Sequence, residues 1–251
     1  MTETANSVQK AARLCGRLML ESGAEIYRVE ETVSLILSAF DLQGVSVLAL
    51  PTGVFYSFTE EDGKTVGEVI RTKVRTTDLG RVSRVNAISR KLVKGETSVE
   101  EALVLLEQEQ SRPPRPLYME MLASAVTASS FAVLFGGNAW DFLVAFLCGV
   151  AESALGLLFP RDNVSKAVYL MLSGVLCALM AMLATSFSPV FSRTPIIVGA
   201  IMPLLPGLAI TNAIRDTVTG DLVSGVARVA DALLQAVAIA AGVAVVIALW
   251  H

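Results

Sequence analysis

Residues 203–231 read PLLPGLAITNAIRDTVTGDLVSGVARVAD, and they lie between two apolar runs long enough to span a bilayer. The segment nevertheless carries prolines, glycines and a set of charged or amide side chains: Asn212, Arg215, Asp216, Asp221, Arg228 and Asp231. A charge at membrane depth costs roughly 2.5–3.5 kcal/mol on insertion scales, and it usually faces a cavity, a partner or a substrate path. Pro and Gly at depth indicate a broken helix. The segment therefore favours a membrane transport protein.

The composition divides the chain into a polar half and an apolar half. Hydrophobic residues make up 53% of the sequence and the mean hydropathy is +0.61, as is ordinary for a membrane protein. Residues 1–116 nevertheless hold 15 of the 20 Lys/Arg and 16 of the 23 Asp/Glu. This balance offers no basic patch, so we expect no nucleic-acid partner. The charged N-terminus lacks the apolar core of a signal peptide, which predicts that residues 1–116 stay in the cytoplasm.

The polar half is predicted to be a small cytoplasmic α+β domain over residues 1–111. Apolar residues at three-to-four spacing predict helices over 7–22 and 25–40, and β-type runs at 45–50, 54–59 and 66–71 predict an antiparallel sheet. Asp78 is expected to open a helix, and Ser98 with Glu101 forms a capping-box pattern that opens another. At about 110 residues the domain is large enough to fold alone.

A proline-rich linker over residues 112–116 is expected to separate this domain from a transmembrane domain over residues 117–251. About 20 apolar residues span a bilayer, and five segments qualify: 117–135, 140–159, 167–187, 195–214 and 222–250. The positive-inside rule, applied to Arg112, Arg115, Arg161, Lys166 and Arg215, predicts a cytoplasmic N-terminus and an outside C-terminus. The expected location is a bacterial-type cytoplasmic (inner) membrane, crossed several times.

The fourth span is predicted to be discontinuous near Leu205, because Pro206 removes a helical hydrogen bond and Gly207 adds a flexible point. Broken half-helices place dipole ends and unpaired carbonyls at the binding sites of many secondary transporters. A polar lining for substrate or coupling is expected to continue along Asn212, Arg215, Asp216, Asp221, Arg228 and Asp231. The alternatives are a plain cytoplasmic loop at residues 215–221, a structural Arg228–Asp231 ion pair, and prolines that only kink a packed helix.

Glu152 is the other intramembrane candidate. It lies about two-thirds through the second span among small residues, which favour close helix packing. A lone acidic residue in a span is a candidate for proton or substrate coupling. The alternative is a glutamate near the inner face whose carboxylate reaches the interface, as we expect for Glu120.

Two strings in the polar half are also candidates. Glu25, Arg28 and Glu30 are predicted to form a fixed polar cluster, or else a helix start with a charge pair three residues apart. Thr52 and Gly53 form either a binding loop or a tight turn between strands. The sequence contains no hydrolase, phosphate-loop, dinucleotide or zinc-protease motif, and its only histidine is the last residue. We therefore expect no enzyme activity, no metal and no cofactor.

Several long strings resemble the threonine/serine exporter family. They are GAEIYRVEETV (residues 23–33), PTGVF (51–55), RTTDLGRVSRVNAISRKLVKGE (75–96) and the membrane segment that begins at Pro203. Family members are either one fused chain of about ten spans or two separate subunits. With five expected spans, this chain resembles the large subunit of the split, YjjP-like type.

The resemblance implies a small partner subunit with about four spans, and export of threonine and serine or of succinate. It places the family motif on Pro206, Gly207, Asn212, Asp216, Gly220, Asp221, Ser224, Gly225 and Arg228. Our hypotheses assign Arg215 or Arg228 to a substrate carboxylate, and Asp216 or Asp221 to a proton or an ammonium group. A homo-oligomer in the lipid bilayer is a further expectation. The competing hypotheses are a membrane-anchored enzyme and a scaffold subunit whose cytoplasmic domain regulates a partner.

Overall fold

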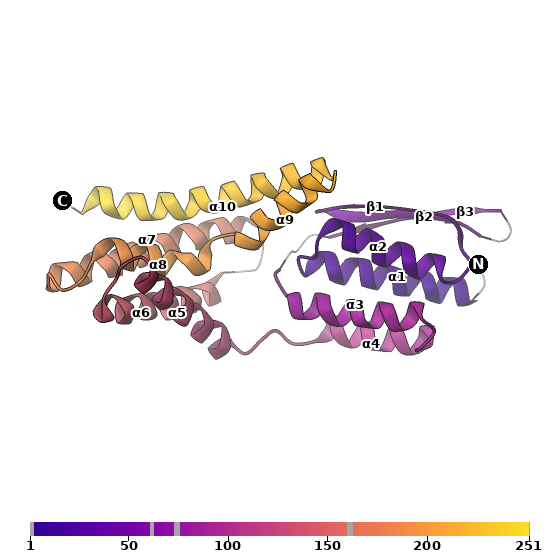
Figure 1. Cartoon of the computed structure of the whole chain (residues 1–251), viewed down its shortest axis with the longest axis horizontal. Helices are drawn as coiled ribbons and strands as arrows, with labels where there is room; N and C mark the ends of the chain where they lie inside the picture. Colours follow the sequence, from indigo (N-terminus) through magenta and orange to yellow (C-terminus); the bar gives the residue numbers. More distant parts are fainter. Residues whose placement is uncertain (1–2, 61–62, 73–75, 160–162, 251) are drawn as a thin grey trace. The chain divides into compact units, whose positions relative to one another are not determined.

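The computed structural model describes residues 3–60, 63–72, 76–159 and 163–250 (Figure 1). Its chain divides into two compact units: a first unit of Met1–Pro113 with Thr211–Val229, and a second unit of Pro114–Ile210 with Ala230–His251. We predicted one boundary at residues 112–116. The contacts instead also group the 211–229 segment with the N-terminal residues, so that helices α9 and α10 each contribute to both units.

The first unit is an α+β fold in three layers. Its sheet has the order β1-β2-β3, α1 and α2 cover one face of it, and α3 and α4 pack on the other side of that helix layer (Figure 1). The elements are α1 (Glu3–Glu21), α2 (Ile26–Ser38), β1 (Gln43–Leu50), β2 (Gly53–Thr59), β3 (Thr65–Arg71), α3 (Leu79–Val93) and α4 (Val99–Ser111). The three strands pair in antiparallel fashion, as the predicted antiparallel sheet requires. A continuous core that includes Leu18, Phe58 and Leu106 lies between the layers.

Local capping signals position the helices of this unit as the sequence predicted. The Asp78 side chain accepts the Arg81 N–H at the start of α3, and Ser98 and Glu101 form the predicted capping box on α4. The chain reverses between α1 and α2 at Gly23, which has a φ of +83°. Glycine adopts this left-handed conformation without the steric cost of a Cβ.

The second unit is helical. Its elements are α5 (Leu117–Leu134), α6 (Ala139–Leu155), η1 (Gly156–Leu158), α7 (Asn163–Phe187), α8 (Arg193–Ile201), η2 (Met202–Leu204), the first turn of α9 (Gly207–Val218) and most of α10 (Leu222–Leu249). A Cβ on Gly149 would lie 2.6 Å from the Ala125 Cα, so this glycine lets α5 and α6 approach closely. Small residues at such crossings are typical of membrane helices.

Four described helices are long and apolar enough to cross a membrane, and a fifth crossing results if α8 and α9 form one bent span. The four are Leu117–Leu134, Ala139–Leu158, Lys166–Phe187 and Leu222–Leu249. This bent span is the fourth in chain order, and it is interrupted where we expected. Helix η2 ends at Leu204, Leu205 is extended and α9 begins at Gly207. The two arms are bent by 59°. The predicted discontinuity is therefore present. Arg161, one of the loop residues used to predict the orientation, lies outside the described residues.

Candidate functional site

The polar motif of α9 and α10 contacts the α1–α2 corner within the first unit. Arg215 forms an ion pair with Glu25, the Asn212 amide donates to the Gly23 carbonyl at 3.2 Å, and the Arg228 guanidinium donates to the Ala24 carbonyl at 2.9 Å. We call this set of contacts, with Asp216, the corner clamp. It brings together two strings of sequence, GAEIYRVE and the α9–α10 motif, that are about 190 residues apart.

Asp216 is the buried centre of the corner clamp. Its side chain has no exposed surface, and one of its carboxylate oxygens lies 2.9 Å from the Nε of Arg228, whose side chain is 11% exposed. The Ile26 N–H, at the first residue of α2, faces the same carboxylate. Glu25 is the N-cap residue of α2 but its side chain caps no N–H of the helix. The Asp216 carboxylate of α9 adds a second negative charge at this helix start.

The sequence did not reveal the partner of Arg228. One open alternative was a structural pair with Asp231, whereas the ion pair in the structure joins Arg228 to Asp216. Asp221 precedes α10, and its carbonyl accepts the Gly225 N–H as the first helical hydrogen bond. A Cβ on Gly225 would lie 2.2 Å from the Thr217 hydroxyl, so glycine is needed where α9 and α10 meet. Ser224 is buried beside it.

The predicted charge pair three residues apart is present, since Arg28 forms an ion pair with Glu25. Glu30 lies one turn further along α2 and accepts the Ala49 N–H of β1 at 2.7 Å. Burial raises the pKa of Glu30, the Ala49 N–H lowers this pKa, and the negative charges of Asp221 and Asp216 raise it. The carboxylates of Glu30, Asp216 and Asp221 are thus close enough to influence one another, and Asp216 is paired with the buried Arg228.

Thr52 lies in the turn that joins β1 to β2, and Gly53 is the first residue of β2. The Thr52 carbonyl accepts the Thr72 N–H at 3.0 Å, and a Cβ on Gly53 would lie only 2.5 Å from the Ile70 carbonyl oxygen. These contacts fit the tight-turn alternative, because glycine is required for the close approach of β2 and β3.

Glu152 lies in the second unit and is 2% exposed, so its carboxylate does not reach the surface of the unit as the interfacial alternative required. One carboxylate oxygen accepts the Ser124 hydroxyl of α5, while the other has no hydrogen-bond partner among the described residues. The sequence does not indicate a role for Ser124, since one serine in an apolar span carries no signal by itself. Pro206 and Gly207 lie at the break before α9, and Asp231 lies on α10 in this second unit.

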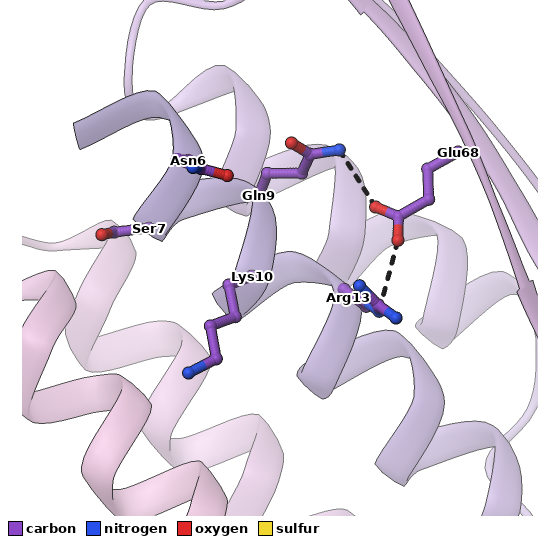
Figure 2. Close-up of a pocket in the computed structure, with 6 residues that line it drawn as sticks. All are labelled: Asn6, Ser7, Gln9, Lys10, Arg13 and Glu68. Carbon is purple, nitrogen blue, oxygen red and sulfur yellow. Dashed lines mark hydrogen bonds and ion pairs between the residues drawn. The ribbon is translucent and has the colours of Figure 1, made fainter. Parts of the chain in front are cut away.

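A polar pocket of about 400 Å³ lies elsewhere in the first unit, between α1 and β3 (Figure 2). Arg13 and Gln9 of α1 both contact the Glu68 carboxylate, at 3.2 and 3.1 Å. Tyr56 also donates to Glu68. Because these polar side chains bind one another, we interpret them as a structural hydrogen-bond network and not as a ligand site. Among the described residues, no group of three His, Cys, Asp or Glu side chains is placed to hold a metal ion.

Comparisons with known proteins identify the family. The chain matches the ThrE family, described as "Putative threonine/serine exporter", over residues 10–250, and it belongs to that family. It is 26% identical to the "Threonine/serine exporter" of Corynebacterium glutamicum and 24% identical to the "Probable threonine/serine exporter" of Mycobacterium tuberculosis. These alignments cover 96% and 90% of this chain but 51% and 43% of the relatives. The chain thus spans about half the length of these two relatives.

A shorter relative aligns along nearly its whole length. The "Probable succinate transporter subunit YjjP" of Escherichia coli is 24% identical over 99% of this chain and 97% of its own. No solved structure matches the chain. The family membership confirms the resemblance stated from the sequence motifs, and it makes an exporter the class of function to test.

The environment of Glu30 leads to a stability prediction. In Glu30→Ala the buried Ala49 N–H loses its acceptor, and we expect the free energy of unfolding to fall by about 1–3 kcal/mol. Glu30→Gln keeps an acceptor oxygen and removes a negative charge beside Asp216 and Asp221, so its stability at pH 7 should equal or exceed that of the wild type. Thermal unfolding of the full chain in neutral detergent measures both effects.

The pH dependence of the same variants has a defined sign. Because folding raises the pKa of Glu30, the folded state binds the Glu30 proton more tightly than the unfolded state does. The free energy of unfolding of the wild type should therefore increase as the pH falls from above the folded-state pKa of Glu30 to its unfolded-state pKa of about 4.3. Glu30→Gln should lose this gain, while Glu31→Gln, an exposed neighbour, should retain it. An equal pH response in Glu30→Gln and wild type would contradict the assignment.

Proposed function

We propose that this chain is a subunit of a secondary transporter that exports a small carboxylate-bearing metabolite. The candidate substrates are threonine, serine and a succinate-like dicarboxylate, because its relatives are named as exporters or transporters of these metabolites. The observation that carries the proposal is the family match over residues 10–250, because it includes both the interrupted span and the corner clamp. No set of nucleophile and base is recognised in the sequence, so we assign the chain no enzyme activity.

The proposed membrane arrangement is multi-pass in a cytoplasmic membrane. The N-terminal residues are placed in the cytoplasm, since Lys and Arg concentrate in residues 1–116 and Arg112 and Arg115 directly precede the first candidate span. With five crossings the C-terminus lies outside. The term "subunit" in the name of the YjjP relative supports a second membrane protein as partner, and we propose a small four-span one.

We assign different roles to the candidate residues according to their contacts in the structure. Arg228 and Asp216 form a buried ion pair, and Arg215 is paired with Glu25. We therefore assign the corner clamp to coupling between the cytoplasmic residues and the interrupted span. The Pro206–Gly207 break places a helix end beside the substrate path, as in other broken transport helices. Glu152 supplies a proton-carrying group for export driven by the proton gradient.

Export by living cells tests the proposal. Cells that produce this chain together with the four-span partner should release threonine, serine or succinate faster than cells that produce the partner alone. The measurement is the external concentration of each metabolite over time after cells are loaded with its precursor peptide or salt. Equal release of all three metabolites by the two kinds of cell would argue against an export function for these substrates.

A further inference from the structure

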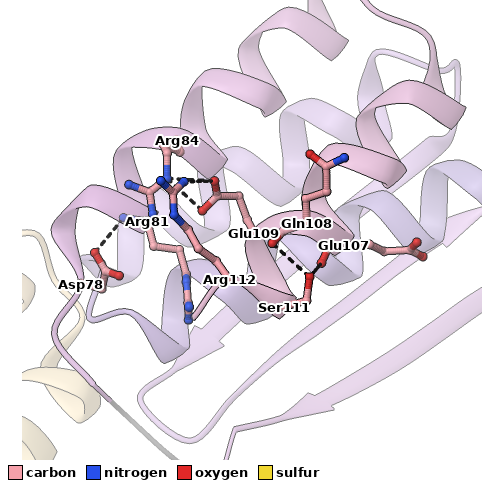
Figure 3. Close-up of polar contacts among 8 residues, drawn as sticks. All are labelled: Asp78, Arg81, Arg84, Glu107, Gln108, Glu109, Ser111 and Arg112. Carbon is pink, nitrogen blue, oxygen red and sulfur yellow. Dashed lines mark hydrogen bonds and ion pairs between the residues drawn. The ribbon is translucent and has the colours of Figure 1, made fainter. Parts of the chain in front are cut away.

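Three arginines gather near the end of α4, immediately before the linker to the first candidate span. Arg84 of α3 places its Nε 2.9 Å from each oxygen of the Glu109 carboxylate, and Arg112 places Nη1 2.8 Å from one of them (Figure 3). Glu109 is only 8% exposed, whereas the two arginine side chains are 37% and 51% exposed. Arg81 lies one turn before Arg84 on α3. We call Arg81, Arg84 and Arg112 the arginine surface.

The arginine surface carries more positive than negative charge. One buried carboxylate holds the two guanidinium groups of Arg84 and Arg112, which leaves this pair of arginines with a net positive charge. The third arginine, Arg81, has a buried Nε and lies beside the Asp78 carboxylate. The neighbouring Glu107 is already paired with Lys10 at 2.7 Å, so it contributes little negative charge here. Both its geometry and its exposure leave Arg84 accessible: its bonds to Glu109 come from Nε and its side chain is 37% exposed. Because a guanidinium carries five N–H donors, we expect Arg84 to be able to bind a second anion.

Covalent geometry places this surface beside the lipid headgroups, given the proposed membrane insertion on which the inference rests. Helix α5 has 18 residues and hence a length of about 27 Å, so its first residue, Leu117, must lie at the edge of the roughly 30 Å hydrocarbon core. Arg112 precedes Leu117 by five residues, which span at most about 18 Å. Arg112 therefore lies within reach of the headgroup layer through the chain itself.

We infer that the arginine surface binds the phosphate groups of anionic lipids. Guanidinium forks match phosphate oxygens in geometry, and basic residues next to a membrane attract anionic headgroups. The groups are spread over α3 and the end of α4 and are partly exposed, which suits a layer of headgroups better than one enclosed small anion. Glu109 keeps the guanidinium groups in place and limits their net charge.

Lipid binding by the full chain in neutral detergent tests the inference. Native mass spectrometry would count bound phosphatidylglycerol and phosphatidylcholine of matched acyl chains. The wild type should prefer phosphatidylglycerol, and Arg84→Gln/Arg112→Gln should weaken this binding at least fivefold, since each basic residue near an anionic surface contributes about fivefold. The control Arg90→Gln/Lys94→Gln removes two exposed charges elsewhere on α3 and its C-cap, and should stay within about twofold of wild type.

The variant Glu109→Gln separates a charge effect from misfolding. Removal of the shared negative charge should strengthen phosphatidylglycerol binding, whereas a misfolded protein would not bind this lipid more tightly. Unchanged lipid binding in Arg84→Gln/Arg112→Gln, or an equal loss in the control pair, would overturn the inference. Displacement of the lipid by millimolar phosphate or succinate would instead assign the site to a free anion. Normal export with no lipid preference would reject only this inference, whereas a lipid preference without export would reject only the proposed function.

Discussion

Arg228→Gln is expected to be the most destabilising single substitution in the corner clamp, lowering the free energy of unfolding by about 3–5 kcal/mol. The variant leaves the carboxylate of Asp216 fully buried without its cationic partner, with only the neutral Ile26 N–H as a donor to it among the described residues. It also removes the donor to the Ala24 carbonyl. Thermal unfolding of the full chain in neutral detergent measures the loss.

A second substitution distinguishes this effect from a general packing defect. Asp216→Asn/Arg228→Gln removes both charges and should recover most of the loss, because a buried ion pair can be replaced by neutral groups at little cost. Arg215→Gln is the matched control, since its pair with Glu25 involves a half-exposed arginine and should contribute less than about 1 kcal/mol. If the double variant is as unstable as Arg228→Gln, the charge of Asp216 is not the cause.

Glu152→Gln is expected to reduce proton-driven export to the level of protein-free membranes while leaving the fold intact. The amide oxygen of glutamine can still accept the Ser124 hydroxyl, and the side chain keeps its shape among the small residues of α5 and α6. It cannot take up or release a proton. The measurement is the initial rate of export at two imposed proton gradients.

Glu120→Gln is the control for this substitution, because Glu120 lies in the first turn of α5 and is exposed. It should export at close to the wild-type rate. Wild-type export by Glu152→Gln, with the same dependence on the proton gradient, would remove Glu152 from the coupling mechanism and leave it a role in packing.

The elements that the sequence predicted well are those specified by neighbouring residues. The caps at Asp78 and Ser98 depend on side chains three residues away, and the strand pairs follow from alternating residues joined by short turns. The interruption before Gly207 follows from the covalent geometry of proline. Each of these signals lies within one turn or one hairpin of the residue that it positions.

The corner clamp could not be predicted in this way. Its contacts join Gly23, Ala24 and Glu25 to residues 189–204 positions later, and no periodicity in either string encodes that pairing. The charges of Arg215, Asp216 and Arg228 therefore suggested a polar lining of the membrane path. In the structure these three side chains contact the residues at the start of α2. A charged residue in an apolar half of a sequence therefore indicates that it has a polar partner, but the sequence does not say which residue that partner is.

Efflux from proteoliposomes shows whether this chain exports a small carboxylate metabolite. Vesicles that contain the purified chain and its four-span partner would be loaded with labelled threonine, serine or succinate and placed under an imposed proton gradient. We predict that at least one of these metabolites leaves faster than from vesicles with the partner alone, and that the difference disappears when the gradient is dissipated. Equal efflux of all three from both kinds of vesicle would contradict the claim.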